Sequence, residues 1–110
     1  MSLQHRQLAE GRWFNLPFVE QMANIGSEVE RALTWKAKNN SPYCQKAFER
    51  ALELIDLTLG DLRNRSRLKE LTRTREAIVD YFWGTNQFSS SESSWRKYYL
   101  SFTYAARKNY

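Results

Sequence analysis

The sequence predicts an all-α protein folded as an antiparallel up-down four-helix bundle. Apolar residues recur at steps of three and four along four segments, which is the period of amphipathic helices and not of strands. Proline, serine, asparagine and glycine lie between these segments, at the places where helices begin and end. Because the connections are short, successive helices are expected to pack side by side in opposite directions.

The first helix is expected at residues 17–38. Pro17 fits its first turn, with Asn15 or Leu16 as the N-cap. The apolar face consists of residues spaced by three and four, namely Phe18, Met22, Ile25, Val29, Ala32 and Leu33. Gly26 lies inside this helix and costs about 1 kcal/mol relative to alanine, unless a close neighbour uses the space.

The second helix is expected at residues 42–59. Ser41 is a capping residue, and Pro42 suits the first helical position. Gly60 is a typical stop after the apolar stripe, which comprises Ala47, Phe48, Ala51, Leu52, Ile55 and Leu59. Residues 61–66 are expected to form a short polar connection.

The third helix is expected at residues 66–83, and Gly84 ends it. Its apolar stripe comprises Leu68, Leu71, Ile78, Val79 and Phe82. Arg75 occupies a position where the stripe would otherwise continue, so one face carries a charged interruption.

The fourth helix is expected at residues 92–107, after a serine-rich loop at 84–94. Ser89 and Glu92 have the spacing of a capping box, with Ser91 and Ser93 as alternative caps. One face gathers the core stripe, namely Trp95, Tyr98, Tyr99, Phe102, Ala105 and Ala106. Burial therefore explains most aromatic residues of the closing stretch WRKYYLSFTYAARKNY, and its basic residues share the outer faces.

Length and composition indicate one folded domain over residues 1–110, with residues 1–14 as an N-terminal arm. Apolar residues make up 42% of the chain and charged residues 26%, which is close to the globular average. Cys44 is the only cysteine and His5 the only histidine, which excludes an intramolecular disulfide and a four-ligand zinc site. No apolar run approaches the ~20 residues that cross a bilayer, and a cytoplasmic protein without a membrane partner is expected.

Catalysis finds little support in the residue types present. The chain has no glycine-rich phosphate loop, and a lone His5 would have to supply the base of a serine triad. Helical ribonucleases of the HEPN type are similar in size and fold class, but their arginine followed by histidine has no counterpart here. The carboxylates at 28, 30, 49, 53 and 56 fit a solvated face better than a metal site, because the Glu-x-x-His motif of bundle sites is missing. We therefore expect no enzyme, no cofactor and no metal.

The positive charge is confined to the second half of the chain. Residues 61–110 hold ten Lys/Arg against five Asp/Glu, a net charge of +5, while residues 1–60 hold seven of each. In an up-down bundle the start of the third helix, the end of the fourth and the start of the first share one end. This end would carry the candidate nucleic-acid-binding residues, which are Arg63, Arg65, Arg67, Lys69, Arg107, Lys108, Arg12 and Tyr104. The composition suits contacts to a nucleic-acid backbone with stacking support, without base-reading residues.

Two alternatives to nucleic-acid binding stay open. The arginines at 63, 65 and 67 directly follow the end of the second helix, where positive charge is favourable in any protein. The chain also carries 16 aromatic residues, more than a small bundle readily hides, and those at helix ends or in loops are candidate interface residues: Trp13, Phe14, Trp83 and Phe88. They predict a homo-oligomer or a scaffolding module that binds a partner protein.

Three segments carry a resemblance to a known family. EGRWFNLPFVEQMANIGSEVERAL, RLKELTRTREAIVDYFWG and the closing YAAR resemble a family of small helical bacterial and archaeal proteins over residues 10–107. That resemblance implies a helical fold and transfers no activity. In size, charge and class the chain is also similar to the helical accessory subunits that accompany reverse transcriptases in retroelements, a likeness of architecture alone.

Overall fold

The computed structural model describes residues 11–108 of the chain, and every regular element in that range is helical. The elements are η2 (Trp13–Asn15), α1 (Phe18–Ala37), α2 (Ser41–Leu59), η3 (Leu62–Arg67), α3 (Leu68–Trp83) and α4 (Glu92–Lys108). The prediction of an all-helical fold with four main helices is confirmed. Residues 1–10 of the predicted N-terminal arm, and residues 109–110, lie outside the described residues.

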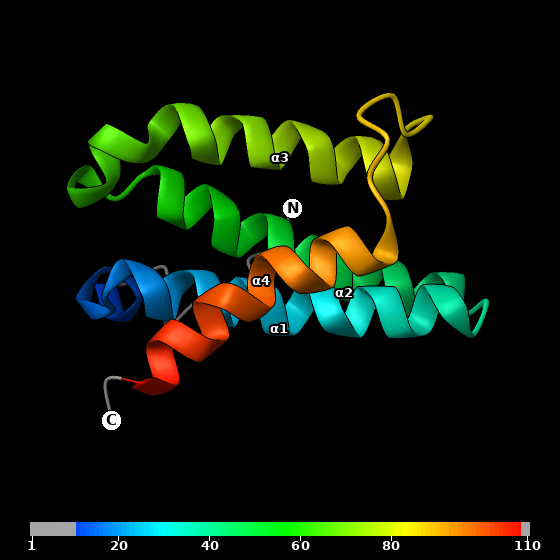
Figure 1. The fold of residues 1–110 in the computed structure, drawn as a ribbon, viewed down its shortest axis with the longest axis horizontal. Helices are drawn as coiled ribbons and strands as arrows, with labels where there is room; N and C mark the ends of the chain where they lie inside the picture. Colours follow the sequence, from blue (N-terminus) through cyan, green and yellow to red (C-terminus); the bar gives the residue numbers. More distant parts are fainter. Residues whose placement is uncertain (1–10, 109–110) are drawn as a thin grey trace.

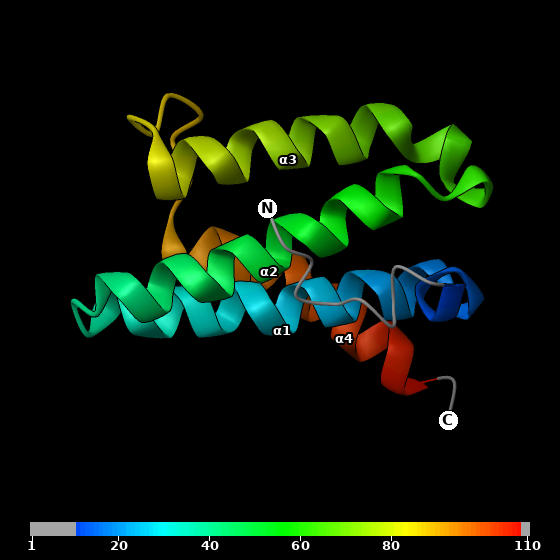
Figure 2. The same cartoon turned by 180° about the vertical axis from the view of Figure 1, so that it is seen from behind.

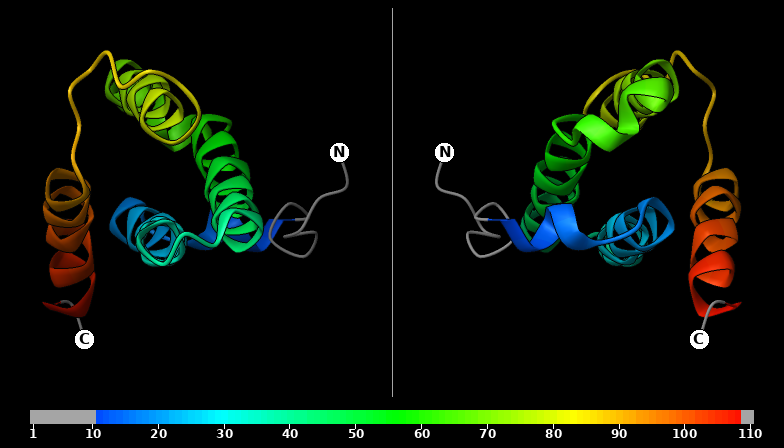
Figure 3. Two further views of the ribbon diagram at one scale, coloured as in Figure 1. Left: turned by 90° about the vertical axis from the view of Figure 1, so that its right-hand side faces the viewer. Right: turned by 90° about the vertical axis from the view of Figure 1, so that its left-hand side faces the viewer.

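The helix α1 is the centre of the fold (Figure 1). It packs along both α2 and α4, while α3 packs on α2. In the end-on views the four helices follow a curved path in the order α4, α1, α2, α3 (Figure 3). This packing is compatible with a bundle, and the closed antiparallel up-down form stays a prediction.

The core fills the space between these helices. Its most completely buried side chains include Trp13, Met22, Ile25, Val29, Leu33, Phe48, Ile55, Leu71 and Ile78. Trp95 and Tyr99 of α4 close it on one side. Burial of each large apolar side chain contributes about 1.5–3 kcal/mol, so these positions hold the helices together.

The starts of α1, α2 and α3 differ from the predicted ones by one or two residues, and α4 starts at Glu92 as predicted. Asn40, not Ser41, caps α2, because its side-chain oxygen accepts a hydrogen bond from the Tyr43 backbone at 3.2 Å. At α4 the cap is Ser91, one of the predicted alternatives, and its reciprocal partner is Ser94, in place of the Ser89 and Glu92 capping box. The Ser94 backbone donates to Ser91 Oγ at 3.1 Å, and the Ser91 backbone donates to Ser94 Oγ at 2.9 Å. Hydrogen bonds from polar side chains near the helix ends thus determine at which residue α2 and α4 begin.

The connection between α2 and α3 is more regular than predicted. Residues 62–67 form the 3-10 helix η3 instead of an irregular polar link, and α3 begins at Leu68 rather than at residue 66. Asp61 caps η3 by accepting the backbone N–H of Arg63 at 3.0 Å. The kink at Asn64, where φ is −96° and ψ 15°, turns the chain from α2 into α3.

Gly26 is the point at which α4 approaches α1. A Cβ atom built on Gly26 would lie 2.8 Å from the Cβ of Tyr99. The glycine therefore lets the Tyr99 ring pack directly against the α1 backbone. Tyr99 is therefore the close neighbour that uses the space left by the missing side chain, which offsets the cost of a glycine inside a helix.

The charged interruption at Arg75 is explained by an interhelical ion pair. Arg75 Nε lies 2.7 Å from Asp56 Oδ1, which joins α3 to α2. The pair raises the pKa of Arg75 through its hydrogen bond to Asp56. The arginine breaks the apolar stripe because it meets a carboxylate on the neighbouring helix.

The interface prediction for Trp13 is corrected by the structure. Trp13 is 1% exposed, and its indole nitrogen donates to Thr58 Oγ1 at 3.0 Å, so it is a core residue of its own chain. Phe14 is half-buried and packs against the core. Trp83 and Phe88 are 52% and 51% exposed, as expected for interface residues, and an interface there stays a prediction.

None of the helices in the described part of the chain combines the length and the hydropathy that crossing a lipid bilayer requires.

Candidate nucleic-acid interface

Three chain segments that are distant in sequence meet at one end of the molecule. The start of α1, the 3-10 helix η3 and the end of α4 all lie on the left in Figure 1 and on the right in Figure 2. The start of α1 lies between the other two. Phe18 connects them, because the Arg67 guanidinium lies 4.2 Å from its ring centroid and the Phe102 ring packs edge-on at 5.9 Å. We call this end the basic pole, and its cationic residues are Arg12, Arg63, Arg65, Arg67, Lys69, Arg107 and Lys108.

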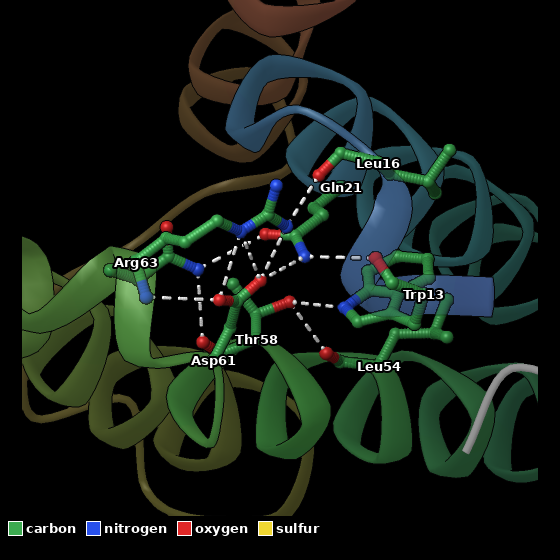
Figure 4. A network of polar contacts seen from close by, with 8 residues as sticks. Trp13, Leu16, Gln21, Leu54, Thr58, Asp61 and Arg63 are labelled. Atoms are coloured by element: carbon green, nitrogen blue, oxygen red, sulfur yellow. Dashed lines mark hydrogen bonds and ion pairs between the residues drawn. The ribbon is translucent and has the colours of Figure 1, made fainter. Parts of the chain in front are cut away.

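A buried polar network holds the basic pole in place (Figure 4). Gln21, which is fully buried, donates to the Trp13 carbonyl at 3.1 Å and to Asp61 Oδ2 at 2.9 Å. The Asn64 amide donates to Gln21 Oε1 and to the Thr58 carbonyl, each at 3.0 Å. Since each of these buried groups has partners, the network fixes η2, α1, α2 and η3 relative to one another.

Arg63 takes part in this network while its side chain stays half exposed. It pairs with Asp61, with Nη2 at 2.6 Å from Oδ2, and donates to the Leu16 carbonyl at 2.7 Å (Figure 4). The hydrogen bond from Arg63 is the main cause that lowers the pKa of Asp61 to about 2. The charge of the guanidinium is therefore offset by the Asp61 carboxylate, so Arg63 adds less to the net positive charge of the pole than an unpaired arginine would.

Four basic side chains of the pole are available to contact a ligand at the surface. Arg65, Lys69, Arg107 and Lys108 are exposed, and within the described residues they make no ion pair. Arg67 is exposed as well, with its guanidinium stacked over Phe18. Arg12 is exposed beside the buried Trp13.

One exposed tyrosine and two glutamates also lie near the basic pole. Tyr104 is 68% exposed, one turn before the basic end of α4. Glu20 and Glu70 lie in the first turns of α1 and α3, and they reduce the net positive charge there. The pole is thus moderately and not strongly basic, with one exposed ring at its edge.

The sequence did not reveal the polar network that supports the pole. Gln21 lies one helical turn before Ile25, on the buried face of α1, and this placement is the available signal. Asp61 and Asn64 were assigned to a polar connection, although both are buried. Sequence spacing alone does not show that these three side chains face one another.

The acidic side chains of the described residues do not form a metal site. No three His, Cys, Asp or Glu side chains between residues 11 and 108 gather closely enough to hold a metal ion. Among the predicted acidic face, Asp56 pairs with Arg75 and Glu49 accepts a hydrogen bond from Gln45 at 3.3 Å. These carboxylates therefore make structural contacts between and along helices.

Comparison of the chain with protein-family models, with curated proteins and with solved structures finds no match.

Proposed function

We propose that this protein is a non-enzymatic cytoplasmic module, an antiparallel helical bundle that binds the nucleic-acid backbone through its basic pole. One observation carries the proposal. Arg65 and Lys69 on one side, and Arg107 and Lys108 on the other, are exposed and make no ion pair among the described residues. These two pairs flank the start of α1. There Phe18 contacts both Arg67 and Phe102, which joins the two sides of the pole. Such spaced cations suit successive phosphates along a strand.

The proposed contacts follow from the side-chain chemistry. Arginine forks pair with phosphate oxygens, and the lysine ammonium groups add point charges. Tyr104 stacks on an unpaired base beside the basic end of α4. Arg63 acts mainly by holding the pole together. Phosphate contacts position a protein without reading sequence, so sequence preference is slight and affinity is in the micromolar range.

Exposed aromatic and aliphatic residues favour a second candidate function. Trp83, Phe88, Leu100 and Tyr104 are each more than half exposed. A homo-oligomer or a scaffolding module would bury such residues against another protein. An accessory subunit of a nucleic-acid machine, such as a retroelement reverse transcriptase, would combine both roles.

A salt titration tests the proposal. Anisotropy of labelled duplex and single-stranded oligonucleotides gives Kd against salt concentration, and about five phosphate contacts give a log–log slope of roughly −4 to −5 on duplex. The double variants Arg65→Gln/Lys69→Gln and Arg107→Gln/Lys108→Gln should each flatten the slope by about 2. The matched control Lys46→Gln/Lys97→Gln removes the same charge from exposed positions outside the pole, and should leave the pole contacts intact.

Two outcomes would overturn the proposal. One is the absence of any binding at ~50 mM salt, where charge effects are weakly screened. The other is an equal loss of affinity in the pole variants and in the control. Sedimentation separates the rival function, because a scaffolding module forms complexes whose stability depends little on salt.

A further inference from the structure

A cavity lies at the end of the molecule opposite the basic pole. It has a volume of about 380 Å³ and opens between the α1–α2 turn and the end of α3. These segments lie on the right in Figure 1. The volume falls in the range of about 300–1,000 Å³ that small-molecule sites occupy.

One wall of the cavity is aromatic. Phe48 is fully buried, stacks on Phe82 with ring centroids 4.6 Å apart, and meets Trp83 edge-on at 4.7 Å. Trp83 nevertheless remains 52% exposed. A tryptophan that packs against Phe48 and stays half exposed offers a stacking surface for a planar ring.

The rim of the cavity is polar and positively charged. Asn39, Asn40 and Gln45 supply amide groups, and Lys36 supplies an ammonium group that lies 5.5 Å from the Tyr81 ring centroid. Among the described residues no carboxylate lines the cavity. The start of α2 at Ser41 adds the positive end of a helix dipole. An anionic ligand with hydrogen-bonding edges fits this rim.

We propose that this cavity binds a nucleoside monophosphate, either free or as the 5′-terminal unit of a strand. The base stacks on Trp83, the Asn39 amide and the amide N–H groups of Asn40 meet its polar edge, and Lys36 pairs with the phosphate. This lining fits a molecule that combines a planar ring, hydrogen-bonding edges and a negative charge. The site is separate from the basic pole and does not depend on nucleic-acid binding there.

Cys44 is a built-in reporter for the test. It is the only cysteine, it lines the cavity and it is half-buried. Burial raises the pKa of its thiol, so alkylation by iodoacetamide is best followed near pH ~9, where thiolate is present. AMP and CMP at about 5 mM, several times the millimolar Kd of a small open site, should slow alkylation at least ~5-fold.

Control ligands separate the parts of the proposed ligand. Adenosine and ribose 5-phosphate, each at the same concentration, should protect much less than AMP. Protection by a 5′-phosphorylated oligonucleotide, but not by its 5′-hydroxyl counterpart, assigns the cavity also to a strand end. Protection by AMP alone assigns it to free nucleotides.

Two variants and one control make the test decisive. Trp83→Leu removes the stacking ring from a half-exposed position, and Lys36→Gln removes the charge; each should abolish most protection. Lys46→Gln, an exposed lysine on the same helix as Cys44, should leave protection unchanged. The proposal is overturned if no nucleotide slows alkylation. It is also overturned if ribose 5-phosphate protects as well as AMP, or if both variants retain full protection.

Discussion

Replacing Gly26 by alanine should destabilise the protein by about 1 kcal/mol, although alanine is the better helix former. The added Cβ would lie 2.8 Å from Tyr99 Cβ and 3.2 Å from its Cγ. Nonbonded carbons prefer separations of about 3.5–4.0 Å, so the overlap is about 0.7 Å. Tyr99 is 4% exposed and is held in the core, so α4 must shift. Overpacking of this kind costs about 1–3 kcal/mol, against about 1 kcal/mol gained in helix propensity.

Gly60→Ala is the matched control. Gly60 has right-handed dihedrals, φ −79° and ψ −7°, and the nearest atoms to a built Cβ are backbone oxygens at 3.6 Å. The substitution should therefore stabilise the protein by about 0.4–1 kcal/mol through the unfolded chain. Urea unfolding followed by far-ultraviolet circular dichroism measures both changes. If Gly26→Ala stabilises the protein as much as Gly60→Ala does, the close approach of α4 to α1 is refuted.

Three further predictions concern single polar groups. The Tyr99 hydroxyl is buried and has no hydrogen-bond partner among residues 11–108, so Tyr99→Phe should raise the free energy of unfolding by about 1 kcal/mol in urea titrations; a decrease would contradict this. Arg63 lowers the pKa of Asp61 from 3.8 to about 2, so the ion pair stabilises the fold fully above about pH 5, and this stabilisation is lost as the pH falls through 3.8 toward 2. Asp61→Asn should flatten this acid limb of the stability profile, and an unchanged profile would contradict the pairing. Arg75→Gln breaks a partly exposed pair with Asp56 and should cost about 0.3–1 kcal/mol by the same titration.

The sequence by itself determined which segments are helical. Apolar periodicity and short-range caps act within a few residues, so α1, α2 and α4 begin and end within one residue of the predicted positions. The cost of Gly26 within a helix raises the question of a close neighbour, but which residue approaches is not visible in the sequence. Such features are local, because helix hydrogen bonds and caps join residues no more than four positions apart.

Only the tertiary structure decided which polar residues are buried and paired. Trp13 looked like an exposed interface residue, yet it donates to Thr58, which is 45 positions away. Arg63 is a candidate phosphate ligand from its position in the sequence, and only the structure shows that it also donates to Asp61 and to the carbonyl of Leu16. Sequence alone does not distinguish an arginine that pairs with a carboxylate of its own chain from one that has no such partner. The difference depends on partners brought together by packing of helices, which no local pattern encodes.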